Sequence, residues 1–224
     1  MSRRVAKNVK DLLASFRGVG PYTFDIICHR RGGLVARTFE AAVREGGTHL
    51  SGMPCAPPVG LQLAMDRTAF IATPNAGTIM AEPEGIPALV ERLTNVVNQL
   101  PDSALTIAAG ALASLAGTAI EAAIPSLRGL VDQGPNSALQ VELGVAVATP
   151  VRYFAMASKY QPTGSLVDVI KRKAVDTIFG AVTNDLVVPT AGVAMTPYFQ
   201  LSAEQVVQFE SERKVHHSSY FQQP

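Results

Sequence analysis

The sequence has little cysteine and almost no excess of charge. Its two cysteines, Cys28 and Cys55, form no CxxC pair, which argues against a disulfide framework or a cysteine zinc site. So few cysteines are typical of a reducing compartment, and we expect a cytoplasmic protein. The net charge of +1 provides no basic surface for nucleic acid. With 47% hydrophobic and 17% charged residues, the 224-residue chain is expected to form one globular domain.

Metal-ligand spacing and a clear membrane span are also missing. The four histidines are His29, His49, His216 and His217. Their spacing is not that of metal ligands on one element, so neither a metal nor a cofactor is expected. The basic N-terminus is not followed by a long apolar stretch and does not resemble a signal peptide. Segment 104–120 is apolar over about 17 residues, the lower limit for a bilayer. Its alanine and glycine content, with Glu121 directly after it, favours a buried helix over a membrane anchor.

Short apolar runs alternate with helical patterns along the chain. The predicted strands are 22–28, 67–72, 151–157 and 205–209. The predicted helices are 5–16, 34–45 and 166–179, with a largely helical stretch over 82–144 and a Gly/Pro-rich loop over 46–60. This alternation predicts the α/β class, with a mostly parallel sheet of about four strands flanked by helices. In such a sheet, the loops at the carboxyl ends of the strands build the site.

The first motif lies where the strand 22–28 gives way to the next helix. Residues 28–37 read Cys-His-Arg-Arg-Gly-Gly-Leu-Val-Ala-Arg. A strand–turn–helix corner is the setting of the nucleophile elbow, G-x-S-x-G, in which a sharp turn lifts the central side chain above the sheet. Gly32 and Gly33 suit the close approach of the two backbones. Alone, a Gly-Gly pair is a common turn, so this interpretation depends on the motifs that follow.

Three later segments complete a pattern. Residues 72–78 read Ala-Thr-Pro-Asn-Ala-Gly-Thr, residues 184–190 read Asn-Asp-Leu-Val-Val-Pro-Thr, and residues 215–221 read Val-His-His-Ser-Ser-Tyr-Phe. Taken singly, Asp185 is compatible with a turn residue, and the histidine pair with a solvated tail. Elbow, acid and histidine nevertheless follow in the chain order of the α/β-hydrolases.

Together these segments resemble lipase/esterase-like α/β-hydrolases, in particular bacterial hydrolases related to the inositol deacylases of glycolipid anchors. The resemblance covers almost the whole chain and implies a Ser-Asp-His triad that hydrolyses carboxylic esters or lipids without a cofactor. It assigns the acid to Asp185 and the base to His217, with His216 as the alternative. It gives the backbone N–H of Arg31 as one oxyanion donor. Arg30 stands at the position of the nucleophilic serine.

Two departures from the family pattern argue against ester hydrolysis. A guanidinium stays protonated and is no nucleophile, so Arg30 cannot form an acyl-enzyme. The thiol of Cys28 is expected to point into the sheet packing. The resemblance also covers only the C-terminal half of such a hydrolase, so the earlier strands and the second oxyanion donor are expected to be missing. Loss of one such donor costs about 10²–10³ in rate.

We therefore expect an incomplete α/β-hydrolase domain over 1–224, with a helical cap inserted at 82–144, that is inactive or impaired as an ester or lipid hydrolase. Without a preceding strand, residues 24–27 are expected to form a sheet edge that aggregates or binds a partner. The alternative is a non-catalytic pseudohydrolase, an interaction or regulatory module of a larger protein or of a missing N-terminal half.

Overall fold

The computed structural model describes most of the chain outside the predicted cap. The described residues are 4–18, 20–44, 48–50, 53–78, 81, 91, 131–145, 152–161, 176, 180, 182–185, 187–196, 198–217 and 219–223. Most of the predicted cap, the apolar segment 104–120 and almost all of the helix predicted over 166–179 lie outside them.

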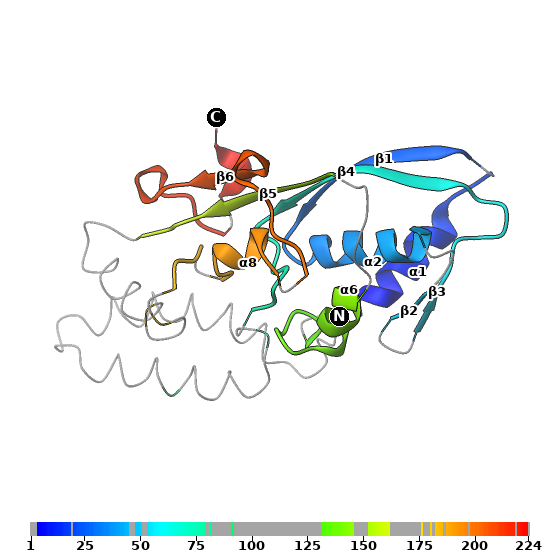
Figure 1. The fold of residues 1–224 in the computed structure, drawn as a ribbon, viewed down its shortest axis with the longest axis horizontal. Helices are drawn as coiled ribbons and strands as arrows, with labels where there is room; N and C mark the ends of the chain where they lie inside the picture. Colours follow the sequence, from blue (N-terminus) through cyan, green and yellow to red (C-terminus); the bar gives the residue numbers. More distant parts are fainter. Residues whose placement is uncertain are drawn as a thin grey trace.

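Four parallel strands form the main sheet (Figure 1). They are β1 (Tyr22–His29), β4 (Leu63–Ile71), β5 (Arg152–Ser158) and β6 (Val206–Phe209), in the spatial order β1-β4-β5-β6. Each neighbouring pair runs parallel. Each predicted strand corresponds to one of these four, which confirms the α/β class with about four parallel strands.

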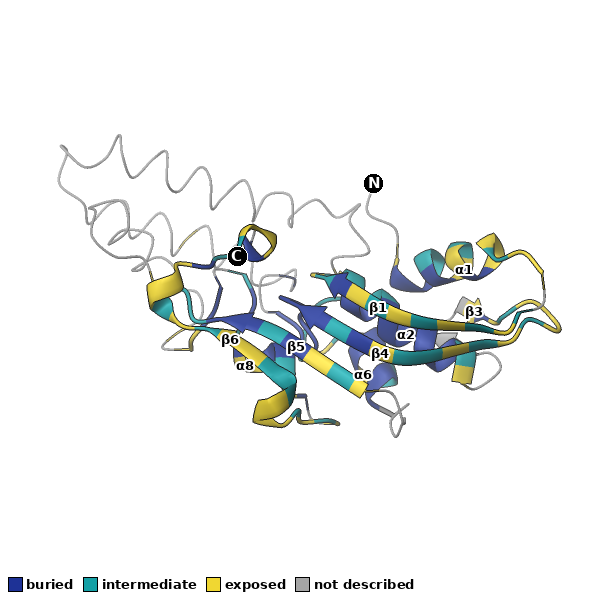
Figure 2. Ribbon diagram, turned by 90° about the horizontal axis from the view of Figure 1, so that it is seen from above, coloured by how far each residue is buried: buried dark blue, intermediate teal, exposed yellow. Residues whose placement is uncertain are grey.

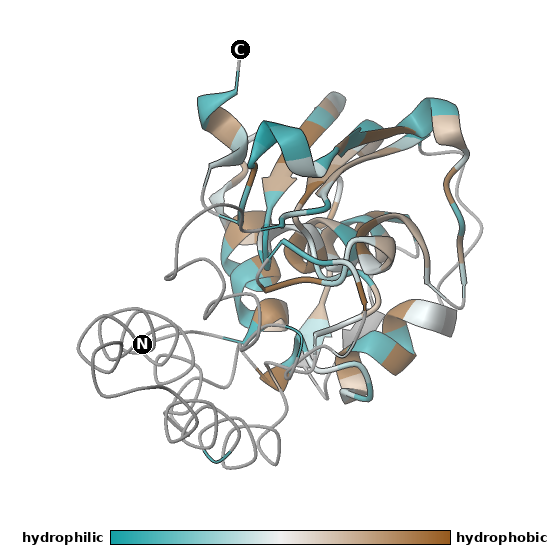
Figure 3. Ribbon diagram, turned by 90° about the vertical axis from the view of Figure 1, so that its left-hand side faces the viewer, coloured by the Kyte–Doolittle hydropathy of each residue, from teal (hydrophilic) through white to brown (hydrophobic). Residues whose placement is uncertain are grey.

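The α-helices of the described chain lie on one side of this sheet (Figure 1). They are α1 (Val5–Ser15), α2 (Gly32–Arg44), α6 (Ala138–Val145) and the short α8 (Ala191–Ala194). A view along the molecule shows apolar segments both on the sheet and on the helices beneath it (Figure 3). The main core therefore lies between one sheet face and this helix layer.

Two apolar clusters position the elbow. Phe70 of β4 packs with Ala155 of β5 and with Val188 of segment 184–190, which we call the acid loop. Nearer the N-terminus, α1 packs its Leu13 against Phe39 of α2. Leu12, the neighbour of Leu13 in the chain, is 39% exposed.

Strand β1 is only partly buried. Its residues alternate between partly covered and exposed, and Ile27 is 74% exposed. Figure 2 shows this alternation along β1 and the first half of β4. The apolar letters of β1 therefore point to two different faces, of which the helices cover one.

Two segments depart from the predicted boundaries. A small antiparallel hairpin, β2 (Thr48–Leu50) and β3 (Met53–Cys55), lies inside the predicted loop 46–60. Strand β4 begins at Leu63, four residues before its predicted start. It passes through Asp66, whose carboxylate forms an exposed ion pair with Arg152 on β5 (3.2 Å).

The described residues contain no helix that is both long and apolar enough to cross a membrane. Nor do they contain a group of three or more side chains that could hold a metal ion. Cys28 and Cys55 are both free and buried.

Candidate active site

The chain turns from β1 into α2 at Arg30. Its φ of 55° lies in the left-handed region, which residues with a Cβ atom rarely adopt. The Arg30 N–H donates to the carbonyl of Ile71 (3.0 Å), and the Gly33 N–H donates to the Arg30 carbonyl (3.1 Å). Residues 29–33, which we call the elbow corner, therefore have the strained backbone of a sharp strand-to-helix turn.

The two glycines of the elbow corner have different roles. A Cβ atom added to Gly33 would lie 2.2 Å from Cγ2 of the buried Thr73, a distance that real atoms do not tolerate. A Cβ added to Gly32 would lie 3.6 Å from Cys28 Cβ, an ordinary contact. Close approach of α2 to the end of β4 therefore requires glycine at position 33 and tolerates a methyl group at position 32.

Asp185 lies in a loop between β5 and α8. Its side chain is buried, and four donors surround it. Oδ1 accepts the N–H groups of Val187 (3.1 Å) and Val188 (2.8 Å). Oδ2 accepts the Tyr220 hydroxyl (3.0 Å) and lies 2.9 Å from Nδ1 of His217. The Asp185 carboxylate, the His217 ring and the Tyr220 hydroxyl form what we call the acid–histidine corner.

The backbone also holds His217 in place. Its N–H donates to the Asp185 carbonyl (3.0 Å), and its side chain is nine-tenths buried. The ring of His216 instead lies 5.8 Å from the ring of Tyr160. Of the two candidate histidines, the structure brings His217 to Asp185. If Nδ1 carries the proton toward Asp185, Nε2 is left as the accepting nitrogen.

His29 links the two corners. It directly precedes Arg30, and its Nε2 lies 3.3 Å from the carbonyl of His217, with the two rings 5.8 Å apart. The exposed ring of Phe221 packs edge-on against His29 at 5.3 Å. The elbow, the acid loop and the tail thus meet at the carboxyl ends of the parallel strands, where sites of α/β sheets are built.

Burial controls the ionisation of three groups around the corners. It raises the pKa of the Tyr220 hydroxyl, and the Asp185 charge adds to this rise, so the hydroxyl stays protonated and donates. Burial and the charge of Arg30 lower the pKa of His29. Burial raises the pKa of Cys28 to about 12. The Cys28 thiol donates to the Ala69 carbonyl (3.1 Å) inside the core and cannot act as a thiolate nucleophile near neutral pH.

The segment 72–78, a motif in the sequence, braces the acid loop. The Thr78 hydroxyl donates to the Val187 carbonyl (2.8 Å), and the Asn75 side-chain amide donates to the Val193 carbonyl (2.8 Å). This bracing role, and those of Tyr220 and His29, were not predicted from the sequence. The aromatic residue shortly after the histidine pair was the available signal for Tyr220.

Arg31 begins the turn into α2. Its carbonyl accepts the N–H groups of Leu34 (3.0 Å) and Val35 (3.2 Å). Its own N–H therefore stands at the start of the helix, next to the corner residue. The predicted oxyanion role of this N–H rests on that position.

Comparisons with known proteins place the chain among hydrolase-like folds. The crystal structure of Bacillus licheniformis lipase BlEst2 in mature form is 15% identical and matches 96% of this chain and 68% of its own, with a TM-score of 0.52. The structure of EstA from Clostridium botulinum is 14% identical and matches 87% of this chain, with a TM-score of 0.50. The match spans only 59% of the EstA chain. These likenesses support a partial α/β-hydrolase fold.

Sequence comparison yields a family without an assigned activity. No curated protein matches the chain. One family model, described as "Domain of unknown function (DUF7379)", matches residues 1–224. The chain therefore belongs to the DUF7379 family.

Proposed function

We propose that this chain is a lipase/esterase-lineage hydrolase domain that keeps the acid and the histidine of a triad but cannot use serine chemistry. The observation that carries the proposal is Arg30 on the left-handed corner, where its φ of 55° gives the backbone of a nucleophile elbow. A guanidinium has no atom that attacks a carbonyl carbon near neutral pH. In this proposal the wild-type chain forms no acyl-enzyme.

The buried pair of Asp185 and His217 supports hydrolase ancestry. Asp185 Oδ2 lies 2.9 Å from His217 Nδ1, the contact that orients an imidazole as general base. A serine at position 30 would give its hydroxyl proton to His217 Nε2 as Oγ attacked the ester carbonyl. The returning proton would leave with the alcohol, and water would then hydrolyse the acyl-enzyme. The Arg31 N–H would donate to the developing oxyanion.

Labelling with a fluorophosphonate probe tests the proposal, because the probe bonds to an activated serine. We expect no adduct on the wild-type chain and one adduct on Arg30→Ser. The adduct should be lost in Arg30→Ser/His217→Ala and kept in Arg30→Ser/His216→Ala. An adduct on the wild-type chain would mean that another residue is the nucleophile. An unlabelled but folded Arg30→Ser would mean that the corners do not form a triad.

A non-catalytic interaction module is the second candidate. It is favoured by the open outer edge of β1, where no described strand pairs. Only the hydrolase-lineage proposal implies an ester or lipid substrate and a relation to the inositol deacylases. Absence of turnover by the wild-type chain agrees with both candidates, so the Arg30→Ser labelling separates a lost triad from a surface that never had one.

A further inference from the structure

The Tyr220 hydroxyl and the His217 ring share one oxygen of the Asp185 carboxylate. Oδ2 of Asp185 lies 3.0 Å from the hydroxyl of Tyr220 and 2.9 Å from Nδ1 of His217. The other oxygen, Oδ1, accepts two backbone N–H groups of the acid loop. Since both oxygens are occupied, the carboxylate cannot turn without losing hydrogen bonds, and the two side-chain donors share the negative charge of Oδ2.

Packing fixes the Tyr220 ring in this position. The residue is 6% exposed and belongs to an apolar cluster with Ile71, Ala72 and Val215. The ring of Phe209, on β6, packs edge-on against it, with the ring centroids 6.0 Å apart. Because close packing of this kind holds a side chain in one rotamer, the hydroxyl reaches the carboxylate as a fixed donor.

The hydroxyl keeps its proton and directs it toward the acid. Burial and the Asp185 charge raise the pKa of the Tyr220 hydroxyl, and a backbone hydrogen bond from Ser158 offsets only part of this rise. An ionised carboxylate accepts and cannot donate, so the hydroxyl is the donor in this contact. With an N–H on its oxygen and an acceptor for its proton, the hydroxyl is polarised from both sides, which strengthens its hydrogen bond to the carboxylate.

A second donor on Oδ2 weakens the first. Each hydrogen bond draws negative charge toward its own proton, so Oδ2 attracts the Nδ1 proton of His217 less strongly than it would if Tyr220 were absent. This attraction is what the acid supplies in a triad, because it holds the imidazole in one tautomer and stabilises the imidazolium that forms during the reaction. The Tyr220 hydroxyl is therefore placed to adjust how strongly Asp185 acts on His217.

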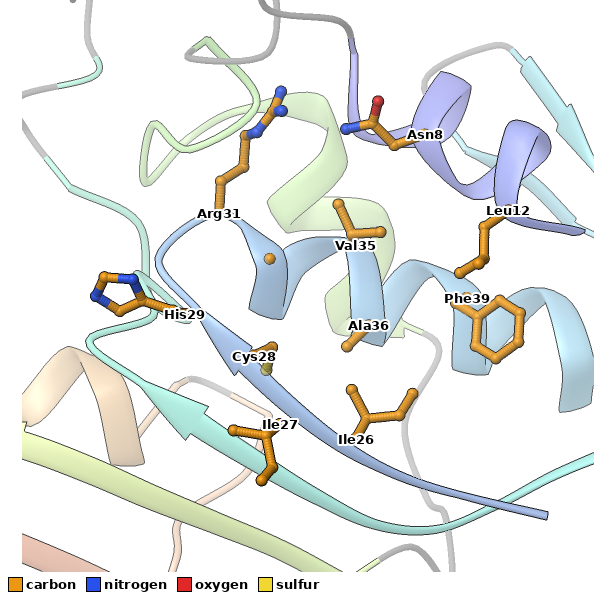
Figure 4. A pocket seen from close by; sticks show the side chains of 11 residues that line it. Asn8, Leu12, Ile26, Ile27, Cys28, His29, Arg31, Val35, Ala36 and Phe39 are labelled. Carbon is orange, nitrogen blue, oxygen red and sulfur yellow. The ribbon is translucent and has the colours of Figure 1, made fainter. Parts of the chain in front are cut away.

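His29 and Arg30 are ionisable neighbours of the acid–histidine corner. The His29 ring lies 5.8 Å from that of His217, and its Nε2 is 3.3 Å from the His217 carbonyl oxygen. In the close view of the groove between β1, α1 and α2, the His29 ring lies at the end of β1, away from Val35 (Figure 4). Burial and the charge of Arg30 lower the pKa of His29. Among the described side chains, Tyr220 alone shares Oδ2 with His217.

We propose that Tyr220 is a positioning residue, which holds the Asp185 carboxylate toward His217 and limits the strength of the hydrogen bond between them. In this role the hydroxyl acts on the imidazole through the carboxylate and not on a substrate. Its use in catalysis rests on the proposed function. The hydrogen bond itself belongs to the wild-type chain, so it can be measured there without a serine at position 30.

Nuclear magnetic resonance of the Nδ1 proton of His217 tests the proposal on the full chain. The chain has four histidines, so isotope-labelled histidine gives a small set of ring signals, and His217→Gln assigns the relevant one. Tyr220→Phe keeps the aromatic ring and removes the hydroxyl, which leaves His217 as the only side-chain donor to Oδ2. We expect the Nδ1 proton signal to move downfield, as the proton of a strengthened hydrogen bond does.

A tyrosine at position 220 that is fluorinated beside its hydroxyl gives the opposite test. Fluorine makes the phenol more acidic and therefore a stronger donor, so the Nδ1 proton signal of His217 should move upfield from that of the wild type. A side chain that only filled space would not produce shifts of opposite sign in the two proteins. Unless both shifts occur with these signs, the proposal is wrong.

Tyr160→Phe is the matched control. It removes a hydroxyl from the ring that lies 5.8 Å from the ring of His216, and it should leave the His217 signal unchanged. A shift as large as that of Tyr220→Phe would mean that the signal reports a general loosening of the tail, which would overturn the proposal. If both expected shifts occur but a folded Arg30→Ser takes up no fluorophosphonate, the proposed function fails and the role of Tyr220 in the hydrogen bond stands.

Discussion

The acid–histidine corner and the elbow corner meet at the same end of the sheet but differ in the chemistry of their side chains. In the first, both oxygens of the Asp185 carboxylate have donors, two from the backbone and two from the rings of His217 and Tyr220. In the second, the backbone at position 30 is left-handed, while the side chain lacks a nucleophilic atom. Backbone geometry and side-chain chemistry at one site are thus separable, because hydrogen bonds and packing maintain the first without the second.

The largest expected effect comes from placing a nucleophile at the elbow corner, which removes the difference between the two corners. With a p-nitrophenyl ester as substrate, we expect Arg30→Ser/His217→Ala to be about 10²–10⁴-fold slower than Arg30→Ser, the usual contribution of a general base. The matched control Arg30→Ser/His216→Ala should retain activity within about threefold, because the His216 ring lies against Tyr160 instead of Asp185. Equal losses in the two double variants would contradict the assignment of the base.

A variant at Asp185 measures how much its hydrogen-bonded carboxylate stabilises the fold. Asp185→Ala leaves four buried donors without an acceptor, so we expect the free energy of unfolding to fall by about 3 kcal/mol. Asp185→Asn keeps one oxygen and the shape of the side chain and should cost clearly less. Urea denaturation of both variants provides the measurement. Similar losses would mean that the side-chain volume matters more than the hydrogen bonds.

The two elbow glycines provide a matched pair. Gly33→Ala forces a methyl group against Thr73, and we expect a loss of about 2 kcal/mol in the free energy of unfolding, typical of overpacking. Gly32→Ala has room for its methyl group and should change stability by less than about 1 kcal/mol. Thermal denaturation of the two variants should show this order. The reverse order would mean that α2 does not approach β4 as closely as described.

The smallest expected effect measures the backbone strain of the left-handed conformation at Arg30. Arg30→Gly and Arg30→Ala lose the same side-chain contacts, but glycine adopts a φ of 55° without a Cβ penalty. We therefore expect Arg30→Gly to be more stable than Arg30→Ala by about 1 kcal/mol. Equal stabilities in chemical denaturation would show that position 30 is not held in the left-handed region.

Much of the fold could be predicted because the apolar runs are local. The strands at 22–28, 67–72, 151–157 and 205–209 each correspond to a strand of the sheet. The hairpin of β2 and β3 was not predicted, because two three-residue strands are too short for a periodic pattern among glycine and proline residues. The early start of β4 was missed because it passes through Asp66, which lies on the exposed part of the sheet, where charge is tolerated.

The order of the motifs also named the residues of the candidate site. Asp185, the histidine pair and Arg30 could be proposed from the sequence, but not the choice between His216 and His217. The side chains of adjacent loop residues point in different directions. The hydrogen bond from the His217 N–H to the Asp185 carbonyl helps to decide which imidazole ring contacts the Asp185 carboxylate. The role of Tyr220 could not be predicted either, because its hydroxyl contacts a residue that lies 35 positions away in the chain.

The sequence by itself determined the α/β class and the chain order of Arg30, Asp185 and the histidine pair, on which the proposed replacement of a nucleophile by Arg30 rests. These follow from local periodicity and from the chemistry of single side chains. Tertiary structure alone decided which histidine contacts Asp185 and why Gly33 has no room for a methyl group. Each depends on groups that are distant in the chain and close in space, and a linear pattern contains no information on that proximity.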